Sequence, residues 1–418
     1  MAATGWFPVA RAADVGTTPV PVGAGGRAFV VVRLRPGGAV SAFPSRCPHR
    51  LVPLAAATVV DGRLQCPFHG WRYDDEGRCV DIPSLGADGT PPPRADLQVP
   101  WAVEERHGWI WLAPDRTATA LPPRHAGEPE PAPAPEPPAG QVLGNLDPAL
   151  DHAWHPVALS RELHPGGWLQ VRLLGRTWTL RRTPGGPAVE PPAFGVREHL
   201  GLLWLAPASP VDLPLEAPEL TDRRFVSGWL PPVRSAGPAG PLADALLDTT
   251  HVPFVHGGPA EPLVADVVEE AGGFTAVLEY ATPAGPSARS VEQRRLVIEF
   301  RAPFQLRLRQ ELPRSGVVST ALFLLQPEDP DSTRVYARVL LSAGSGRPLP
   351  APSTVVQEMA DVHRMLEEDA ALQARLGTAG LPLDLRDELH VPADRLGVAL
   401  RQALCDFVTA AGRGAVAA

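Results

Sequence analysis

The stretches C-P-H-R at residues 47–50 and C-P-F-H-G-W at residues 66–71 decide the fold of the N-terminal part of this chain. Each stretch supplies one cysteine and one histidine, and sixteen residues separate the first pair from the second. Around them, strand-like runs at residues 29–34 and 109–112 alternate with Gly/Pro turns, as in small antiparallel β domains. The sequence therefore predicts an all-β domain in which two loops bring four possible metal ligands together. These ligands are Cys47, His49, Cys66 and His69.

Two thiolates and two imidazoles from two short loops are the ligand set of a Rieske [2Fe-2S] cluster, in which cysteines hold one iron and histidines the other. Replacing two thiolates by neutral imidazoles raises the reduction potential, so such a cluster accepts electrons readily. A tetrahedral zinc ion also takes two cysteines and two histidines, but zinc fingers usually bring two cysteines together and then two histidines. Here each loop supplies one of each, and a proline follows each cysteine, so the pattern favours the Rieske cluster.

The composition argues against several other classes of protein. With 418 residues and 44% hydrophobic residues, the chain has room for two or three soluble domains with a large core. Its net charge of −8 gives no electrostatic support for binding nucleic acid. No apolar stretch approaches the ~20 residues of a membrane span, and the N-terminus lacks the basic and apolar regions of a signal peptide. Four cysteines, two of them assigned to the cluster, make a poor disulfide framework and fit a reducing, cytoplasmic location.

The chain divides into four segments. A cluster domain at residues 1–117 precedes a Pro/Ala/Glu-rich linker at residues 118–142, which cannot bury enough apolar area to fold. Residues 143–210 repeat the first segment, since W-H-P-V-A echoes the earlier W-F-P-V-A and R-E-H-L-G-L-L-W-L-A-P echoes E-R-H-G-W-I-W-L-A-P. This copy lacks both ligand loops, so we expect a degenerate Rieske-like β domain without a cluster and with a structural role. Residues 211–418 are expected to form the catalytic domain.

Alternating apolar and polar runs in that last domain predict six strands of one large twisted antiparallel sheet. The strands are expected at residues 264–269, 275–280, 295–300, 305–311, 317–326 and 334–342. Two helices with apolar residues at 3.6-residue spacing are expected at residues 354–376 and 393–411. The predicted fold class is therefore α+β, with two β domains followed by a domain of an antiparallel sheet and helices.

A second possible metal site lies in D-A-L-L-D-T-T-H-V-P-F-V-H at residues 244–256, which we predict to be a helix followed by a turn. His251 and His256 would not share a face of a continuous helix, but Pro253 between them ends or kinks the helix. Both imidazoles can then converge on one point. A mononuclear Fe(II) oxygenase uses two histidines and one carboxylate on one face of an octahedron, which leaves positions open for O2 and substrate.

The carboxylate is expected from the first of the two C-terminal helices, which carries Glu367, Glu368 and Asp369 in succession. The apolar stripe of this helix leads, in a further step of three residues, to Asp369. The stripe consists of Val355, Met359, Val362 and Leu366. A carboxylate on a core-facing stripe is costly unless a metal ion or hydrogen bonds compensate for its burial. We therefore predict Asp369 as the third ligand, with Glu368 as the alternative.

Asp248 is expected one helical turn before His251, on the same face of the helix. There its carboxylate can accept a hydrogen bond from an imidazole N–H and so fix the tautomer and basicity of that ligand. It could equally couple to a histidine of a nearby Rieske cluster. The alternative interpretation is a charge on the helix surface.

These two constellations together resemble the Rieske non-heme iron oxygenases, most closely the branch with vanillate demethylase-like and pheophorbide oxygenase-like proteins. The segments that carry the resemblance are residues 47–50, 66–73, 77–84 and 246–256. The resemblance implies a helix-grip catalytic sheet and a ring-shaped trimer, in which the cluster passes electrons to the iron of a neighbouring subunit. It also implies that an acidic residue at the position of Asp248 bridges the two centres. Many members carry Asn at the positions of Asp244 or Ala245, and this chain departs from them because neither residue is Asn. Asp244 is a further catalytic candidate.

The sequence thus leads to the hypothesis of an oxygenase that hydroxylates or oxidatively demethylates an apolar or aromatic small molecule. Electrons should come ultimately from NAD(P)H through a separate ferredoxin or flavin reductase, because the chain has no flavin or nicotinamide fingerprint. One alternative is an electron-transfer or binding protein whose C-terminal domain has lost catalysis. Another is a scaffold that zinc stabilises.

Overall fold

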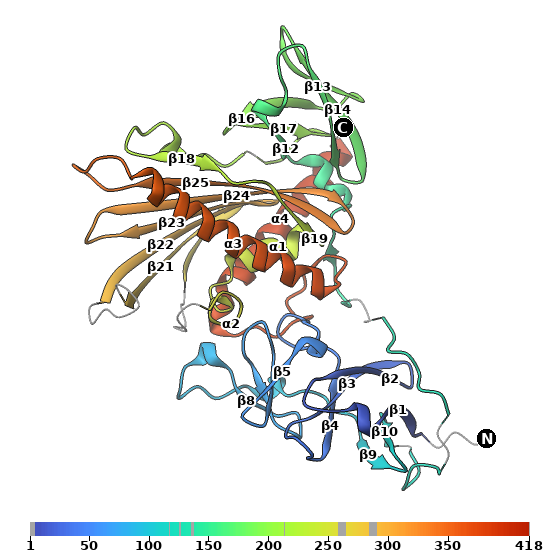
Figure 1. Ribbon diagram of the computed structural model, residues 1–418. Coiled ribbons are helices and arrows are strands. Elements are labelled where there is room, and N and C mark those ends of the chain that lie inside the picture. The colour runs from blue at the N-terminus through green and yellow to red at the C-terminus, as the bar shows by residue number, and fades with distance from the viewer. Residues whose placement is uncertain are drawn as a thin grey trace. The chain divides into compact units, whose positions relative to one another are not determined.

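The computed structural model describes residues 5–116, 118–124, 127–134, 138–212, 214–257, 265–283 and 291–417. Its contacts divide the chain into two compact units. The first unit contains Met1–Pro137, Thr250–Pro262 and Arg386–Val391, and the second contains Pro138–Thr249, Leu263–Leu385 and Pro392–Ala418. Figure 1 shows both units with their helices and strands.

The first unit is built from small antiparallel sheets whose strands are short and rich in Val, Phe and Trp. One sheet has the order β1-β10-β9, a second β2-β3-β4, and a third β5-β6-β7-β8. Their bounds are β1 Phe7–Arg11, β2 Val20–Ala24, β3 Arg27–Arg33, β4 Val40–Pro44, β5 Thr58–Val60, β6 Arg63–Gln65, β7 Arg72–Tyr73, β8 Cys79–Asp81, β9 Ala102–Arg106 and β10 Trp109–Ala113. In the sequence, β5 and β6 lie between the two metal-ligand loops. The first loop precedes β5, and the second joins β6 to β7. Short 3-10 turns complete the unit at Ala12–Asp14, Leu54–Ala56, Pro83–Leu85 and Pro93–Ala95.

The predicted linker contributes to this first unit, which extends to Pro137. Trp6 donates a hydrogen bond from its indole nitrogen to the carbonyl oxygen of Thr119, at 2.7 Å. A Cβ added at Gly23 of β2 would come within 2.3 Å of the carbonyl oxygen of Pro131, so only glycine lets the two backbones approach this closely. Within the segment predicted as linker, residues 125–126 and 135–137 lie outside the described residues.

Two three-stranded sheets of the second unit repeat two sheets of the first. The orders β12-β17-β16 and β13-β14-β15 correspond to β1-β10-β9 and β2-β3-β4. The pairing register shifts between Pro156 and Ala158 in one copy and between Pro8 and Ala10 in the other, so even this irregularity recurs. The bounds are β12 His155–Leu159, β13 Trp168–Leu173, β14 Arg176–Thr183, β15 Gly186–Glu190, β16 Gly195–His199 and β17 Leu202–Ala206.

The second copy omits the region that carries the ligand loops in the first. β15 ends at Glu190 and β16 begins at Gly195, whereas β4 ends at Pro44 and β9 begins only at Ala102. The repeated sheets therefore share an architecture, but the copy has no room for two ligand loops at the corresponding point.

The rest of the second unit is one eight-stranded antiparallel sheet with the order β18-β25-β24-β23-β22-β21-β20, on which β19 also pairs with β25. The bounds are β18 Val226–Trp229, β19 Val233–Ala236, β20 Asp266–Glu270, β21 Gly273–Pro283, β22 Val291–Arg301, β23 Gln305–Leu312, β24 Val317–Asp329 and β25 Ser332–Ser342. A two-stranded ladder joins β11, Val142–Leu143, to β26, Leu381–Pro382.

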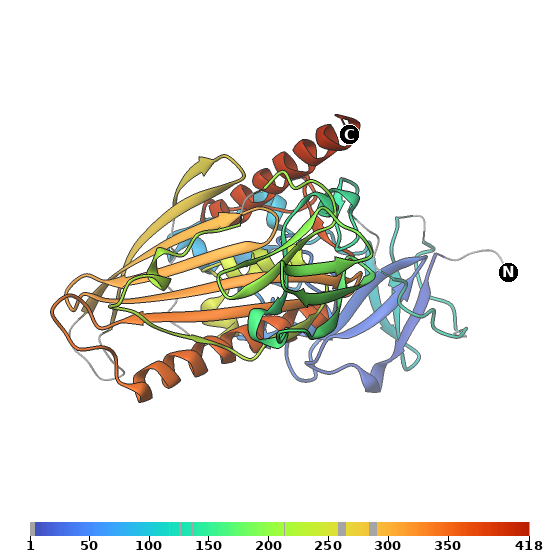
Figure 2. The same ribbon diagram turned by 90° about the horizontal axis from the view of Figure 1, so that it is seen from above.

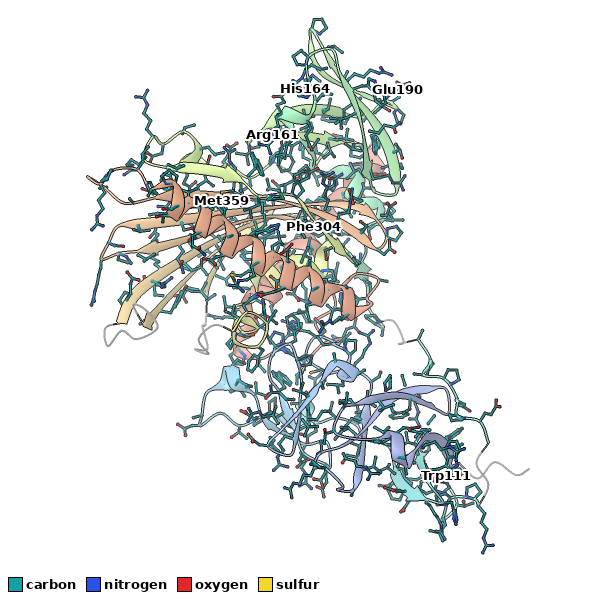
Figure 3. All side chains as sticks on the ribbon, in the orientation of Figure 1. Trp111, Arg161, His164, Glu190, Phe304 and Met359 are labelled. Atoms are coloured by element: carbon teal, nitrogen blue, oxygen red, sulfur yellow. The ribbon has the colours of Figure 1, made fainter. Side chains whose placement is uncertain are left out.

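Three helices pack on this sheet (Figures 1 and 2). They are α1 Ala239–Leu247, α3 Pro352–Leu376 and α4 Arg395–Ala417. α3 contacts β18, β19 and β25, α4 contacts β20 and β21, and α1 contacts both helices and β24. The main hydrophobic core lies between helices and sheet, and Phe304 and Met359 both belong to it (Figure 3). Short 3-10 turns lie at Pro148–His152, Ser160–Glu162, Pro218–Leu220 and Pro392–Asp394. Among the described residues, no helix is long and apolar enough to cross a membrane.

The predicted α+β class is confirmed, and all eight strands and both C-terminal helices expected from periodicity are present. Val264, the first residue of one predicted strand, lies outside the described residues. The predicted six-stranded sheet was too small, because β18 and β19 also belong to it. Both are only four residues long and are separated by Pro231 and Pro232, so they lack a sustained alternating pattern.

A buried histidine of the second unit should make stability depend on pH. His155 is 1% exposed and donates a hydrogen bond from Nε2 to the carbonyl oxygen of Leu150, at 2.7 Å. Burial lowers the pKa of His155 to about 4. Between pH 6.5 and pH 4 the unfolded chain therefore binds a proton that the folded chain does not, and the folded state loses about 3 kcal/mol of stability as pH falls.

His155→Gln keeps a donor for Leu150 but cannot titrate. In urea unfolding, wild-type stability should fall more steeply than that of the variant over this range. Parallel curves would contradict this account.

Candidate functional site

The two ligand loops of the first unit close in the same way. The amide of Cys47 donates a hydrogen bond to the carbonyl oxygen of Val52 at 2.9 Å, and the amide of Cys66 donates to that of Trp71 at 2.9 Å. In both loops the donor is the cysteine and the acceptor lies five residues later. Gly70 closes the second loop with a φ of +69°, which favours glycine. Each loop is thus folded by its own backbone around its cysteine and histidine.

The four predicted cluster ligands are buried together. Their relative exposures are 1% for Cys47, His49 and Cys66 and 3% for His69. The imidazole rings of His49 and His69 have centroids 4.3 Å apart, and the ring of His49 also stacks on Trp71 at 4.5 Å. The thiol of Cys47 hydrogen-bonds to the hydroxyl of Tyr73 at 3.2 Å. Histidine is therefore grouped with histidine, as a Rieske cluster requires.

The thiols are also grouped with each other. A hydrogen bond with Cys47, together with burial, raises the pKa of the Cys66 thiol well above its ordinary value. Both cysteines must be thiolates to bind iron, so cluster binding would displace the proton that the two sulfurs share. The donor set and its grouping fit a [2Fe-2S] cluster.

The second candidate site differs locally from its prediction, because the helix expected to run to His251 ends at Leu247. Asp248 caps α1 in an extended conformation, with φ −77° and ψ 116°. The following threonines are β-branched and disfavour helix continuation. The short helix α2, Val252–Val255, then begins with Pro253 in its first turn, where the missing N–H costs no hydrogen bond. The prediction that Pro253 breaks the helix was therefore wrong, since the break precedes His251.

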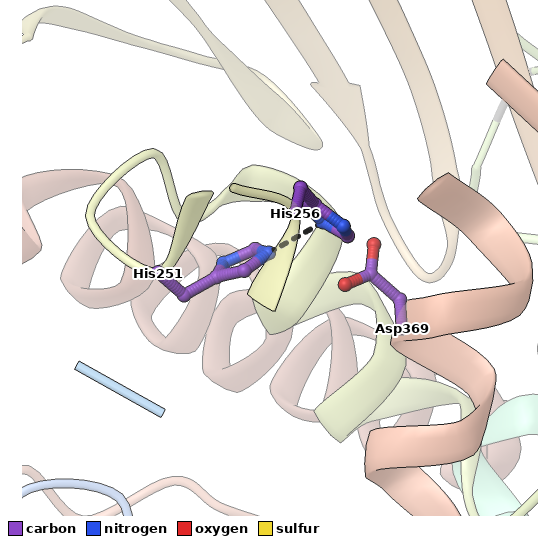
Figure 4. Close-up of side chains that lie close together, drawn as sticks. All are labelled: His251, His256 and Asp369. Carbon is purple, nitrogen blue, oxygen red and sulfur yellow. Dashed lines mark hydrogen bonds between the residues drawn. The ribbon is translucent and has the colours of Figure 1, made fainter. Parts of the chain in front are cut away.

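His251 and His256 flank α2 as its N-cap and C-cap residues. Their Nε2 atoms lie 3.0 Å apart, and the ligand atoms of His251, His256 and Asp369 all lie within 4.8 Å of one another (Figure 4). Metal–imidazole bonds are ~2.1 Å long, so two nitrogens at right angles on one ion are ~3.0 Å apart. His251 is 2% exposed and Asp369 3%. Two histidines and a buried carboxylate thus meet at a spacing that suits a metal ion.

The side chains next to Asp369 on α3 point elsewhere. Glu368 forms an ion pair with Arg364 at 2.9 Å. The side chain of Glu367 is 62% exposed and lies 3.4 Å from His363. Among the described residues, the group that could hold a metal ion contains Asp369 and neither glutamate. The geometry therefore favours Asp369 over Glu368.

Asp248 and Asp244 have surroundings that the sequence did not predict. Because Asp248 is in extended backbone, it does not lie one helical turn before His251, and that expectation was wrong. Asp244 is 8% exposed and accepts two hydrogen bonds from the Arg401 guanidinium of α4, at 3.0 Å and 2.9 Å. This buried ion pair ties α1 to α4, so Asp244 has a structural partner.

One residue that contacts the candidate ligands, Phe68, was not singled out from the sequence. The ring of Phe68 lies 4.1 Å from that of His69 and 5.4 Å from that of His251. Phe68 therefore connects a candidate cluster ligand with a candidate iron ligand by direct ring contacts. The signal was present, because Phe68 stands inside C-P-F-H-G-W, but an aromatic residue has no ligand chemistry that would mark it.

Two family models match the chain. The model of the Rieske [2Fe-2S] domain matches residues 5–99, and that of the vanillate O-demethylase oxygenase C-terminal domain matches residues 237–410. The first region contains all four predicted cluster ligands, and the second contains His251, His256 and Asp369.

Curated relatives match part of the chain. The 3-chlorobenzoate-3,4-dioxygenase oxygenase subunit of Comamonas testosteroni is 42% identical over 110 residues, which are 26% of this chain and 25% of the relative. The oxygenase component of dicamba O-demethylase from Stenotrophomonas maltophilia is 39% identical over 88 residues, 21% of this chain and 25% of the relative. Protein TIC 55 of Pisum sativum is 41% identical over 73 residues, 17% of this chain and 13% of the relative. The chain thus spans far less than two thirds of the length of these relatives.

Solved structures match over most of the chain but at low similarity. NdmA of Pseudomonas putida CBB5 with caffeine has a TM-score of 0.38 and 19% identity, and covers 97% of this chain and 92% of its own. Apo dicamba monooxygenase has a TM-score of 0.34 and 15% identity, and covers 97% of both chains. The assignment therefore rests on the two family matches. The Rieske domain implies a [2Fe-2S] cluster, and the oxygenase domain implies a mononuclear iron. The resemblance seen in the sequence is confirmed: this chain contains a Rieske [2Fe-2S] domain and a vanillate O-demethylase-type oxygenase C-terminal domain.

Proposed function

We propose that the protein is an oxygenase that hydroxylates or oxidatively demethylates an apolar or aromatic small molecule. The observation that carries the proposal is the meeting of His251, His256 and Asp369 within 4.8 Å, in a chain that also has a Rieske domain. An electron-transfer protein without catalysis would have no use for two histidines and a buried carboxylate arranged in this way. The oxygenase is therefore favoured over the electron-transfer or binding protein.

In this proposal His251, His256 and Asp369 bind Fe(II), and Cys47, His49, Cys66 and His69 bind the cluster. The bound groups supply electron storage and O2 activation, which side chains alone cannot provide. The carboxylate of Asp369 offsets part of the charge of a divalent ion, and a set of only three protein ligands leaves coordination positions free for O2 and substrate. Burial of His251 and Asp369 keeps bulk water away from these ligands.

Asp248 and Asp244 remain in the proposal with different roles. Asp248 lies three residues before His251, and we propose that its carboxylate orients an imidazole of one of the two centres. Asp244 is proposed to act through its ion pair with Arg401, by fixing α1 and therefore the segment that leads to His251. Asp244 would then be a positioning residue.

The substrate class is proposed from the chemistry of the relatives and of the sheet. Dicamba O-demethylase and 3-chlorobenzoate-3,4-dioxygenase are named for aromatic substrates. Phe274, Ile298 and Phe300 on β21 and β22 belong to the apolar core on which the helices pack. A substrate beside such side chains would gain binding energy from apolar surface.

The remaining parts of the proposal concern partners and organisation. We propose a separate ferredoxin or flavin reductase that passes electrons from NAD(P)H, a homotrimer, and a cytoplasmic location, which suits thiolate ligands. We also propose domains at residues 1–117, 143–210 and 211–418, joined by a linker at residues 118–142. The recurrence of two sheets with the same strand order supports the second of these domains.

Metal analysis together with a visible spectrum tests the function. Anaerobically reconstituted protein should bind three irons per chain, two in the cluster and one at the histidine–carboxylate site, and should be red-brown. With a reductase and a substrate it should consume O2 in proportion to NAD(P)H. Two irons and no oxygen uptake would establish the electron-transfer alternative, and a colourless zinc protein would establish the scaffold.

A further inference from the structure

One segment from far along the chain packs on the first ligand loop. Arg386–Val391 lies between β26 and the turn before α4 in the sequence, yet it belongs to the first unit. The amide of Leu389 donates a hydrogen bond to the carbonyl oxygen of Pro48 at 2.8 Å. Pro48 stands between Cys47 and His49, so this bond holds the backbone between two candidate cluster ligands.

The residues on either side of Leu389 contact Arg50. The guanidinium Nη1 of Arg50 donates to Nδ1 of His390 at 3.0 Å and lies 3.5 Å from a carboxylate oxygen of Glu388. The side chains of Arg50 and Glu388 are only 5% and 4% exposed. Three successive residues, 388–390, thus hold the ligand loop through one backbone bond and two side-chain contacts.

A buried ion pair is a costly way to hold a loop. Removing two charges from water costs several kcal/mol for each ion, and the attraction between them repays this only with good geometry. Apolar side chains could fill the same space at no such cost. A pair of opposite charges, however, fixes the position of the ligand loop. It also places charged groups beside the proposed cluster.

We propose that residues 388–390 anchor the ligand loop at residues 47–50, and that Glu388 tunes the cluster by opposing the charge of Arg50. The proposal rests on the proposed cluster at Cys47, His49, Cys66 and His69. Reduction adds one electron to the cluster, and the Arg50 cation stabilises the added negative charge. Glu388 opposes that effect, so neutralising Glu388 should make the cluster easier to reduce. Glu388 and His390 are positioning residues.

The test is a redox titration of the cluster in the full chain. The EPR signal of the reduced cluster monitors the titration. Glu388→Gln should raise the midpoint potential by about 59 mV, which corresponds to a tenfold change in the reduction equilibrium. Glu388→Asp keeps the charge and should restore most of the wild-type potential. Glu76→Gln is the matched control, because Glu76 pairs with Arg78 in the same unit but both side chains are more than 60% exposed. It should leave the potential unchanged.

The outcomes separate this proposal from the proposed function. Protein without a [2Fe-2S] spectrum would refute the cluster itself. A normal cluster with the same potential in wild type and Glu388→Gln would refute the tuning by Glu388 and leave the proposed cluster in place. If Glu388→Gln does not fold, His390→Asn serves instead, and the rate at which a chelator removes the cluster is measured. The anchor requires several-fold faster loss than in Glu76→Gln, and equal rates would overturn it.

Discussion

His251→Ala should lose the mononuclear iron and keep the cluster. The iron content should fall from three to two per chain, while the red-brown spectrum and the EPR signal of the reduced cluster remain. Removing His251 leaves His256 and Asp369 as a two-ligand site, which is too weak to retain a divalent ion against chelation. Changes in outer partners of a metal ligand already cost 10–100-fold in affinity or activity, so loss of a ligand should reduce substrate turnover more than ~100-fold.

Two variants of α3 complete this experiment. Asp369→Asn should behave like His251→Ala, because an amide carries no charge to offset that of the iron. Glu368→Gln is the matched control, since Glu368 is adjacent on α3 but pairs with Arg364, one helical turn earlier. It should retain three irons and normal turnover. Turnover that persists in His251→Ala, or iron loss in Glu368→Gln with none in Asp369→Asn, would contradict the assignment.

The candidate ligands could be selected from the sequence because their signals are local. Cys47 and His49 are two residues apart and Cys66 and His69 three, so the motif carries the geometry of each loop. Asp369 was found in a different way, from its place on the buried stripe of a long periodic helix. α3 spans Pro352–Leu376 and buries Leu366, Asp369 and Leu372, as 3.6-residue spacing requires.

What the sequence did not reveal depends on contacts between distant residues. Arg401 pairs with Asp244 across 157 positions, and Arg50 contacts His390 across 340. No periodicity or motif in one chain joins such positions. The early end of α1 was missed for a different reason. Asp248 and the threonines after it are only weak helix breakers, whereas Pro253 is a strong one, and the stronger signal was followed.

Cys66→Ser should remove the metal centre that His251→Ala keeps. Serine has a similar size but offers no thiolate, so the cluster should not assemble and the protein should be colourless. Iron should fall from three to one per chain, and that one should remain at His251, His256 and Asp369. Turnover with the reductase should be abolished, because electrons no longer have a carrier into the protein. The first unit should also lose several kcal/mol of stability, since binding the cluster is part of its folding free energy.

Cys79 provides the matched control for this variant. It is a third buried cysteine of the same unit, it stands in neither ligand loop, and burial raises the pKa of its thiol to about 12. Its thiol donates a hydrogen bond to the carbonyl oxygen of Asp81, which a serine hydroxyl can also do. Cys79→Ser should therefore keep the colour, three irons and turnover. A coloured Cys66→Ser protein, or a colourless Cys79→Ser protein with normal folding, would show that the cluster is held by other residues. The whole electron route would then have to be drawn through another part of the first unit.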